Sequence, residues 1–277
     1  MGIYVSEYGV RLEIDFKMTR IRIKRLLLVI LFLISSSYLI AQKKDLNIVY
    51  IGDSITAGGQ MSDPATEAPP AIASEWLRKQ KDIGKVEFSN QGVSGFTTVD
   101  FLPSTHTVFV NVDKAAKAFD DKQATLIFSI MLGTNDSACE GPNGSPVTAD
   151  QYHNNLKAII DDLLKDFPES KIIIQRPTWY SPNTYNSARY LQEGLTRLQS
   201  YFPQVDKLVA EYSLSNPRHV FASGQEAFQY FKANYLTDSN PEQGRQGIFY
   251  LHPNKKGSVS LGNIWAAAIY QQIVKNQ

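Results

Sequence analysis

The stretch LNIVYIGDSITAGG, residues 46–59, decides the fold. It begins with an apolar run of β-forming residues that stops at Gly52, and a Gly-rich turn then places Asp53 and Ser54 directly after the run. Such a run is typical of a strand buried on both faces. On position alone, Ser54 could be a turn residue that caps the next helix or a reactive group at the strand end.

The rest of the chain repeats the pattern of a short apolar run followed by a segment with helical periodicity. Further buried strands are expected at 85–92, 124–133, 171–177 and 218–224. Helices are expected at 71–80, 113–119, 149–167, 186–213, 225–236 and 257–275, with a capping box from Thr148 to Gln151. The alternation predicts an α/β fold with a parallel sheet. No composition break divides residues 42–277, which are expected to form a single domain.

Residues 1–41 have the layout of a leader that contains a signal peptide. Basic side chains follow Met18, the expected start, and precede an apolar core at 26–34 and a Ser-rich stretch that ends at Ala41. We therefore expect a periplasmic or secreted protein with no stable membrane insertion after signal removal, although a retained N-terminal anchor is the alternative. Cys139 is the only cysteine in the sequence, so no internal disulfide is expected.

Charge and motif content exclude several classes of function. The formal net charge is +1, and no run of Lys or Arg lies outside the leader, so no nucleic-acid partner is indicated. The sequence has neither an H-E-x-x-H motif nor paired cysteines, and its Gly-rich turns lack the lysine of a phosphate loop. We expect neither a metal nor a cofactor.

Four short blocks carry the functional signal. They are GDSITAG (52–58), NQGVSGFTT (90–98), GTND (133–136) and LHPN (251–254), and the first three follow the first three expected strands. Ligands of such sheets bind beyond the carboxyl ends of the strands. The set resembles the SGNH (GDSL-type) hydrolases, which are named for a Ser, a Gly, an Asn and a His in separate blocks, and is nearest in look to exported carbohydrate O-acetylesterases. This resemblance spans about residues 45–275 and implies a three-layer, flavodoxin-like sandwich with a sheet of roughly five parallel strands.

The resemblance also implies roles for the matched residues. Ser54 would be the nucleophile and His252, expected to open the last helix, its base. The backbone N–H groups of Ser54 and Gly95 and the side-chain amide of Asn135 would form an oxyanion hole. Fixed donors suit acyl transfer because its intermediate carries negative charge on the former carbonyl oxygen. Taken singly, Gly95 could equally be a turn glycine and Asn135 a helix cap.

The sequence departs from the family pattern at one position. An aspartate usually precedes the histidine by three residues, but Phe249 stands there. Three interpretations compete: a main-chain carbonyl orients the ring in a Ser–His dyad, a carboxylate from elsewhere replaces the aspartate, or catalysis is lost. The candidate carboxylates are Asp238, Glu242 and Glu140.

Aromatic residues after the fourth expected strand suggest the substrate. Trp179 and Tyr180, with Tyr185 and Tyr190 further along, are expected near the edge that holds Ser54, and aromatic faces suit sugar rings. The sequence thus predicts an exported serine esterase that hydrolyses acetyl or other short acyl esters of small molecules or saccharides. The alternative is a carbohydrate-binding pseudoenzyme of the same fold, and the oligomeric state stays open.

Overall fold

Five parallel strands form the central sheet of the computed structural model, in the order β2-β1-β3-β4-β5. The strands are β1 (Lys44–Gly52), β2 (Ile83–Gly92), β3 (Thr125–Met131), β4 (Lys171–Ile174) and β5 (Val220–Ala222). The structure describes residues 20, 24 and 43–275, so almost all of the leader predicted at 1–41 lies outside the described residues. All five predicted strands are present, and their order is that of flavodoxin-like folds, which confirms the predicted α/β class.

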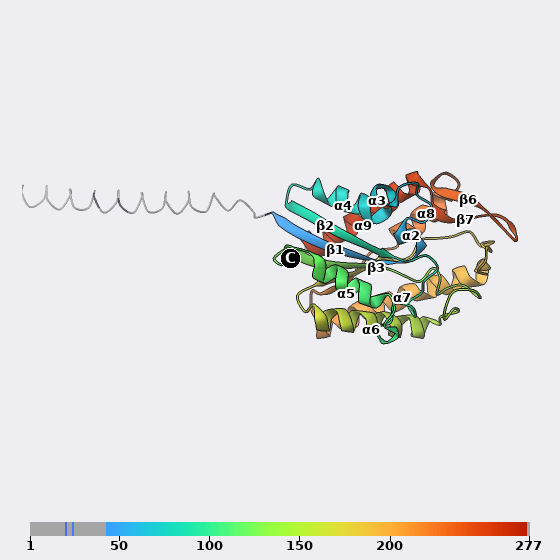
Figure 1. Ribbon diagram of the computed structural model, residues 1–277, viewed down its shortest axis with the longest axis horizontal. Helices are drawn as coiled ribbons and strands as arrows, with labels where there is room; N and C mark the ends of the chain where they lie inside the picture. The colour runs from blue at the N-terminus through green and yellow to red at the C-terminus, as the bar shows by residue number, and fades with distance from the viewer. Residues whose placement is uncertain (1–19, 21–23, 25–42, 276–277) are drawn as a thin grey trace, which may run out of the picture. The chain divides into compact units, whose positions relative to one another are not determined.

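Helices cover both faces of the sheet (Figure 1). One face carries α4 (Pro69–Arg78), α8 (Glu226–Asp238) and α9 (Lys255–Ile269), and the other carries α5 (Phe109–Ala118), α6 (Ala149–Asp166) and α7 (Leu191–Ser215).

The sheet separates two hydrophobic cores, and successive side chains of β1 enter them alternately. Ile48 and Tyr50 pack on the side of α4 and α9, and Val49 and Ile51 pack on the other side. Because both faces are buried, β1 has no polar face, which explains the apolar run in the sequence.

The predicted helices are all present, with shifted ends. The capping box at the start of α6 is confirmed, since the Thr148 side chain accepts from the backbone of Gln151 and the Gln151 side chain accepts from the backbone of Thr148. After Ile269 the last helix continues as a π-helical segment, η2 (Tyr270–Lys275). Three short elements lie between these strands and helices: α2 (Ser54–Ala57), α3 (Pro64–Glu67) and the 3₁₀ turn η1 (Pro103–Thr105).

An antiparallel hairpin of β6 (Ser239–Gly244) and β7 (Gly247–Pro253) was not predicted. It lies at the end of the molecule where the central strands terminate (Figure 1). The expectation that His252 opens the last helix is wrong, because His252 lies on β7 and α9 begins at Lys255 with Asn254 as its N-cap. The hairpin therefore carries the histidine block to the functional edge of the sheet.

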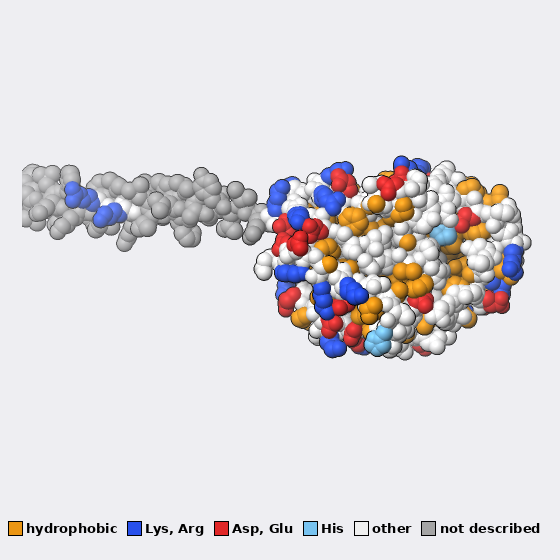
Figure 2. Space-filling view, viewed as in Figure 1, with side chains coloured by type: hydrophobic (Ala, Val, Ile, Leu, Met, Phe, Trp, Pro, Cys, Tyr) orange, Lys and Arg blue, Asp and Glu red, His pale blue; other side chains and the backbone are white. Residues whose placement is uncertain are grey.

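Among the described residues, no helix has both the length and the apolar composition needed to cross a membrane. On the face shown in Figure 2, acidic and basic side chains are interspersed.

Candidate active site

A tight turn between β1 and α2 presents Ser54 at the carboxyl end of a central strand. Gly52 is required there, because a Cβ atom would lie 2.0 Å from Thr56 Oγ1 and 2.7 Å from the Met131 carbonyl oxygen. Asp53 caps α2 by accepting a hydrogen bond of 2.9 Å from the backbone N–H of Ile55. The capping role thus belongs to Asp53, and the Ser54 hydroxyl is left available for another partner.

The hydroxyl of Ser54 lies 2.9 Å from Nε2 of His252. The two residues are 198 positions apart, and the β6–β7 hairpin brings them together. With the proton of the imidazole on Nδ1, Nε2 accepts from the serine hydroxyl, which is the geometry of a nucleophile and its general base.

The opposite ring nitrogen of His252 contacts a carboxylate. Nδ1 lies 2.9 Å from Oε1 and 3.0 Å from Oε2 of Glu242, and Oε1 also accepts from the backbone N–H of His252 at 3.1 Å. The side chains of His252 and Glu242 are only 13% and 17% exposed. A carboxylate in this position can accept a hydrogen bond from Nδ1 and thereby favour the tautomer in which Nε2 faces Ser54 as an acceptor.

Glu242 lies on the strand opposite the position that the resemblance assigns to aspartate. In the hairpin register, Glu242 on β6 pairs with Phe249 on β7. Phe249 is buried in the core. Of the three sequence interpretations, the structure matches a carboxylate supplied from elsewhere, because the acid approaches His252 from the neighbouring strand.

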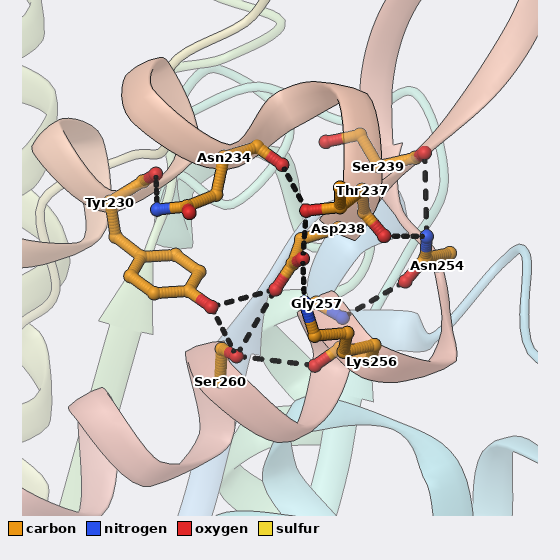
Figure 3. Close-up of polar contacts among 9 residues, drawn as sticks. All are labelled: Tyr230, Asn234, Thr237, Asp238, Ser239, Asn254, Lys256, Gly257 and Ser260. Atoms are coloured by element: carbon orange, nitrogen blue, oxygen red, sulfur yellow. Dashed lines mark hydrogen bonds and ion pairs between the residues drawn. The ribbon is translucent and has the colours of Figure 1, made fainter.

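Asp238, another candidate for the third position, is occupied by other partners (Figure 3). Its buried carboxylate accepts from the hydroxyls of Tyr230 and Thr237 at 2.7 and 2.6 Å and pairs with Lys256 at 2.7 Å. Its main-chain carbonyl accepts from the backbone N–H of Asn254 at 3.0 Å. Asp238 thus joins the end of α8 to the start of α9 and does not contact His252.

Glu140, the third candidate, is also directed elsewhere. Its side chain is 66% exposed and forms an ion pair of 2.6 Å with Arg189. A bridge between the backbones of Glu140 and Arg189 connects the segment after Asn135 to the segment before α7. Glu140 is therefore wrong as a partner of His252.

The two remaining matched residues line the same pocket as Ser54 and His252, which has a volume of about 610 Å³. Gly95 has a φ of +82°, and no atom lies within 4 Å of the place where a Cβ would stand, so its backbone borders open space. The Asn135 side chain donates from Nδ2 to the Phe96 carbonyl oxygen at 2.9 Å and accepts at Oδ1 from the Tyr190 hydroxyl at 2.7 Å. The second N–H of its amide has no protein partner among these contacts.

Two buried carboxylates support the turns behind these residues. Burial raises the pKa of Asp136 to about 6, although hydrogen bonds from the hydroxyl and backbone of Thr98 oppose that shift. Burial also raises the pKa of Asp53 to about 6, against the hydrogen bond from Ile55. Neither carboxylate lines the pocket beside Ser54.

Neither of the two aromatic residues predicted to bind substrate, Trp179 and Tyr180, lines the pocket. Tyr180 is fully buried and its hydroxyl lies 2.9 Å from Oγ of Ser137, so its assignment as a substrate-binding residue is wrong. Trp179 packs against Tyr235 with ring centroids 5.0 Å apart and does not line the pocket. The sequence pattern that locates the ends of strands does not indicate which aromatic side chains of the following loop are buried in the core. Tyr190 is the aromatic residue of that segment that does line the pocket.

Within the described part of the chain, no group of three or more His, Cys, Asp or Glu side chains is placed to hold a metal ion. Cys139 is buried and donates its thiol hydrogen to the Tyr190 carbonyl oxygen at 3.2 Å.

Comparisons with known proteins identify the family of the chain. Residues 50–258 match the GDSL-like Lipase/Acylhydrolase family. A search of curated proteins finds no significant match.

Three solved structures have a similar fold. A lipase/acylhydrolase from Enterococcus faecalis is 18% identical with a TM-score of 0.55, and the alignment covers 82% of this chain and 96% of that one. A carbohydrate acetylesterase from Sinorhizobium meliloti is 16% identical (TM-score 0.54; 81% and 98% covered). An acetyl xylan esterase from Geobacillus stearothermophilus is 19% identical (TM-score 0.54; 84% and 96% covered). With the family match over most of the chain, the protein belongs to the GDSL-like lipase/acylhydrolase family and is an ester hydrolase.

Proposed function

We propose that the protein is an exported serine esterase that removes an acetyl or another short acyl group from a saccharide. The observation that carries this proposal is the continuous chain of contacts from the Ser54 hydroxyl through both nitrogens of His252 to the Glu242 carboxylate. Glu242 also removes the reason for the pseudoenzyme interpretation, which depended on the lack of an orienting acid.

The proposed reaction has two halves. Ser54 Oγ attacks the ester carbonyl carbon while His252 Nε2 takes the hydroxyl proton, and the negative oxygen of the intermediate accepts from the backbone N–H groups of Ser54 and Gly95 and the free amide N–H of Asn135. The C–O bond of the ester then breaks and His252 returns the proton to the departing alcohol. Water repeats the sequence on the acyl-enzyme and releases the acid.

The lining of the large pocket supports a neutral, hydroxyl-rich alcohol. Polar side chains without positive charge dominate it: Gln60, Ser94, Asp100, Asn143, Asn186 and Ser187. The lining contains neither Lys nor Arg, so it offers no counter-charge to an anionic alcohol. Asp100 is held by hydrogen bonds of 2.8 Å from the Thr97 backbone and the Asn143 amide, and this fixed carboxylate could accept from sugar hydroxyls.

A much smaller hollow, of about 10 Å³, adjoins both Ser54 and His252 and supports a short acyl group. Such a volume holds about one water-sized group. Its other walls are Ile55, Gly58, Gly59, Gln60, Met61, Pro69, Pro253 and Ser258. We place the acyl methyl in this hollow and the alcohol in the large pocket, because the two spaces meet at the reacting pair.

The decisive experiment measures acetate release from 4-nitrophenyl acetate and from an acetylated oligosaccharide by the purified protein, Ser54→Ala and His252→Ala. We expect both variants to lose activity, and a serine-reactive phosphonate to label wild type at Ser54 only. A wild type that binds saccharide but neither turns over nor becomes labelled would overturn the esterase proposal. Export is tested separately: N-terminal sequencing of protein recovered outside the cytoplasm should begin at Gln42.

A further inference from the structure

If Asn135 serves the oxyanion hole, its side-chain amide must keep its bond to the protein and also direct one N–H at the substrate. One N–H of its amide is already used by the Phe96 carbonyl oxygen at 2.9 Å, so only the other can face a substrate oxygen. The Asn135 side chain is almost fully buried, which makes its orientation a property of its neighbours rather than of solvent.

The hydroxyl of Tyr190 completes the fixation of this amide. It donates to Oδ1 of Asn135 at 2.7 Å, while the Phe96 carbonyl can only accept. Rotating the amide by half a turn would set Oδ1 against that carbonyl oxygen and remove the acceptor of the Tyr190 hydroxyl. A donor at one end and an acceptor at the other therefore select one orientation, with the free N–H in the pocket.

Tyr190 is itself held rigidly. Its ring is buried and packs edge-on against Tyr180, with centroids 5.4 Å apart. Burial is also the main reason that the pKa of Tyr190 lies far above its ordinary value, so the hydroxyl keeps its proton and remains a donor.

The backbone ties Tyr190 to the same loop that carries Asn135. The backbone N–H of Cys139 donates to the Arg189 carbonyl oxygen at 2.6 Å, and the N–H of Arg189 donates to the Glu140 carbonyl oxygen at 2.9 Å. The ion pair between the two side chains reinforces this bridge. The donor and the amide that it orients are thus attached to one locally bonded unit.

We propose that Tyr190 is a positioning residue that aims the Asn135 amide at the developing oxyanion. The inference rests on the proposed esterase function and deepens it. Tyr190 does not take part in bond making. Its hydroxyl acts through Asn135, and its effect is confined to the stage at which charge develops on the carbonyl oxygen.

The test compares Tyr190→Phe with Tyr180→Phe, which removes a neighbouring buried hydroxyl that contacts Ser137 and not Asn135. Loss of one oxyanion donor in a protease costs roughly 10²–10³ in kcat, so a misaimed donor in Tyr190→Phe is expected to cost about 10- to 100-fold, with KM changed less than about threefold. Tyr180→Phe should keep kcat within about threefold of wild type. Thermal melts of both variants show whether they are equally folded.

A double-mutant cycle separates positioning from general damage. In an Asn135→Ala background, Tyr190→Phe should change kcat by less than about twofold, because the amide that it orients is gone. Equal losses in Tyr190→Phe and Tyr180→Phe, or an undiminished Tyr190→Phe effect without Asn135, would overturn this inference alone. A wild-type protein inactive on every ester and unlabelled by the phosphonate would overturn the proposed function instead.

Discussion

Replacing Glu242 with glutamine should nearly abolish turnover while leaving the fold intact. The carboxylate lies about 3 Å from Nδ1 of His252 and is largely shielded from water. When the ring becomes an imidazolium, two unit charges roughly 4 Å apart interact by about 4 kcal/mol at an effective dielectric constant of about 20. Loss of that term from the transition state corresponds to about 10³-fold in kcat. In a serine protease, the equivalent change of aspartate to asparagine costs about 10⁴-fold.

The assay is the initial rate of 4-nitrophenyl acetate hydrolysis over a range of substrate concentrations, so that kcat and KM are obtained separately. Glu242→Gln should lower kcat by about 10³-fold with KM nearly unchanged. Gln243→Ala is the matched control, since Gln243 is the exposed neighbour on β6 and its amide bonds only to the Gly244 carbonyl oxygen. If Glu242→Gln kept kcat within about tenfold of wild type, a neutral acceptor would suffice to orient His252, and the argument from the carboxylate charge would be refuted.

Three further outcomes are expected. Met61→Ala should enlarge the small hollow and lower the ratio of kcat/KM for acetate esters to kcat/KM for butyrate esters by about tenfold, which is the discrimination that about one methylene gives in an apolar pocket. Leu236→Ala, at a distant exposed site, should leave this ratio unchanged. Asp238→Ala should cost about 1–3 kcal/mol of unfolding free energy in urea while kcat falls less than about tenfold; a loss as large as that of Glu242→Gln would contradict our assignment. Because Asp136 has a raised pKa of about 6, the folded state keeps a proton that the unfolded chain loses near pH 4, so wild-type stability should fall by about 3 kcal/mol through this group as pH rises from about 4 to about 6. Asp136→Asn should lack that part of the fall, and parallel curves for the two proteins in urea titrations at several pH values would exclude it.

The central sheet could be predicted because its strands are buried on both faces. The run at 46–52 contains residues that enter both cores, so burial alone makes it apolar and its end marks the functional edge. The same logic places Ser54, Gly95 and Asn135 together, since each follows a strand of one parallel sheet.

The hairpin could not be predicted in this way. Along β6 only Ser239 is fully buried, so its six residues, SNPEQG, carry no apolar pattern and resemble a loop. The identity of the acid depends on which β6 residue pairs with β7, and the sequence left Asp238, Glu242 and Glu140 as candidates. The register that places Glu242 opposite Phe249 is a long-range property of the folded chain.

Ser54 lies at the end of a central strand, whereas His252 and Glu242 lie on the β6–β7 hairpin. Glu242 and His252 are both on the hairpin, so their contact is local and survives small movements of the hairpin as a whole. The contact between Ser54 and His252 joins the hairpin to the sheet and depends on how the hairpin is anchored.

Two anchors fix the hairpin in place. At its base, the backbone N–H of Asn254 donates to the Asp238 carbonyl oxygen, and the side-chain amide of Asn254 donates to the Thr237 carbonyl oxygen (Figure 3). Along β7, the backbone of Tyr250 exchanges hydrogen bonds of 2.9 and 2.8 Å with the backbone and hydroxyl of Ser181. Weakening either anchor should therefore lengthen the serine–histidine distance before it disturbs the histidine–glutamate pair. If the proposed function holds, the orienting acid can therefore come from β6 in place of β7, because acid and base remain on one hairpin.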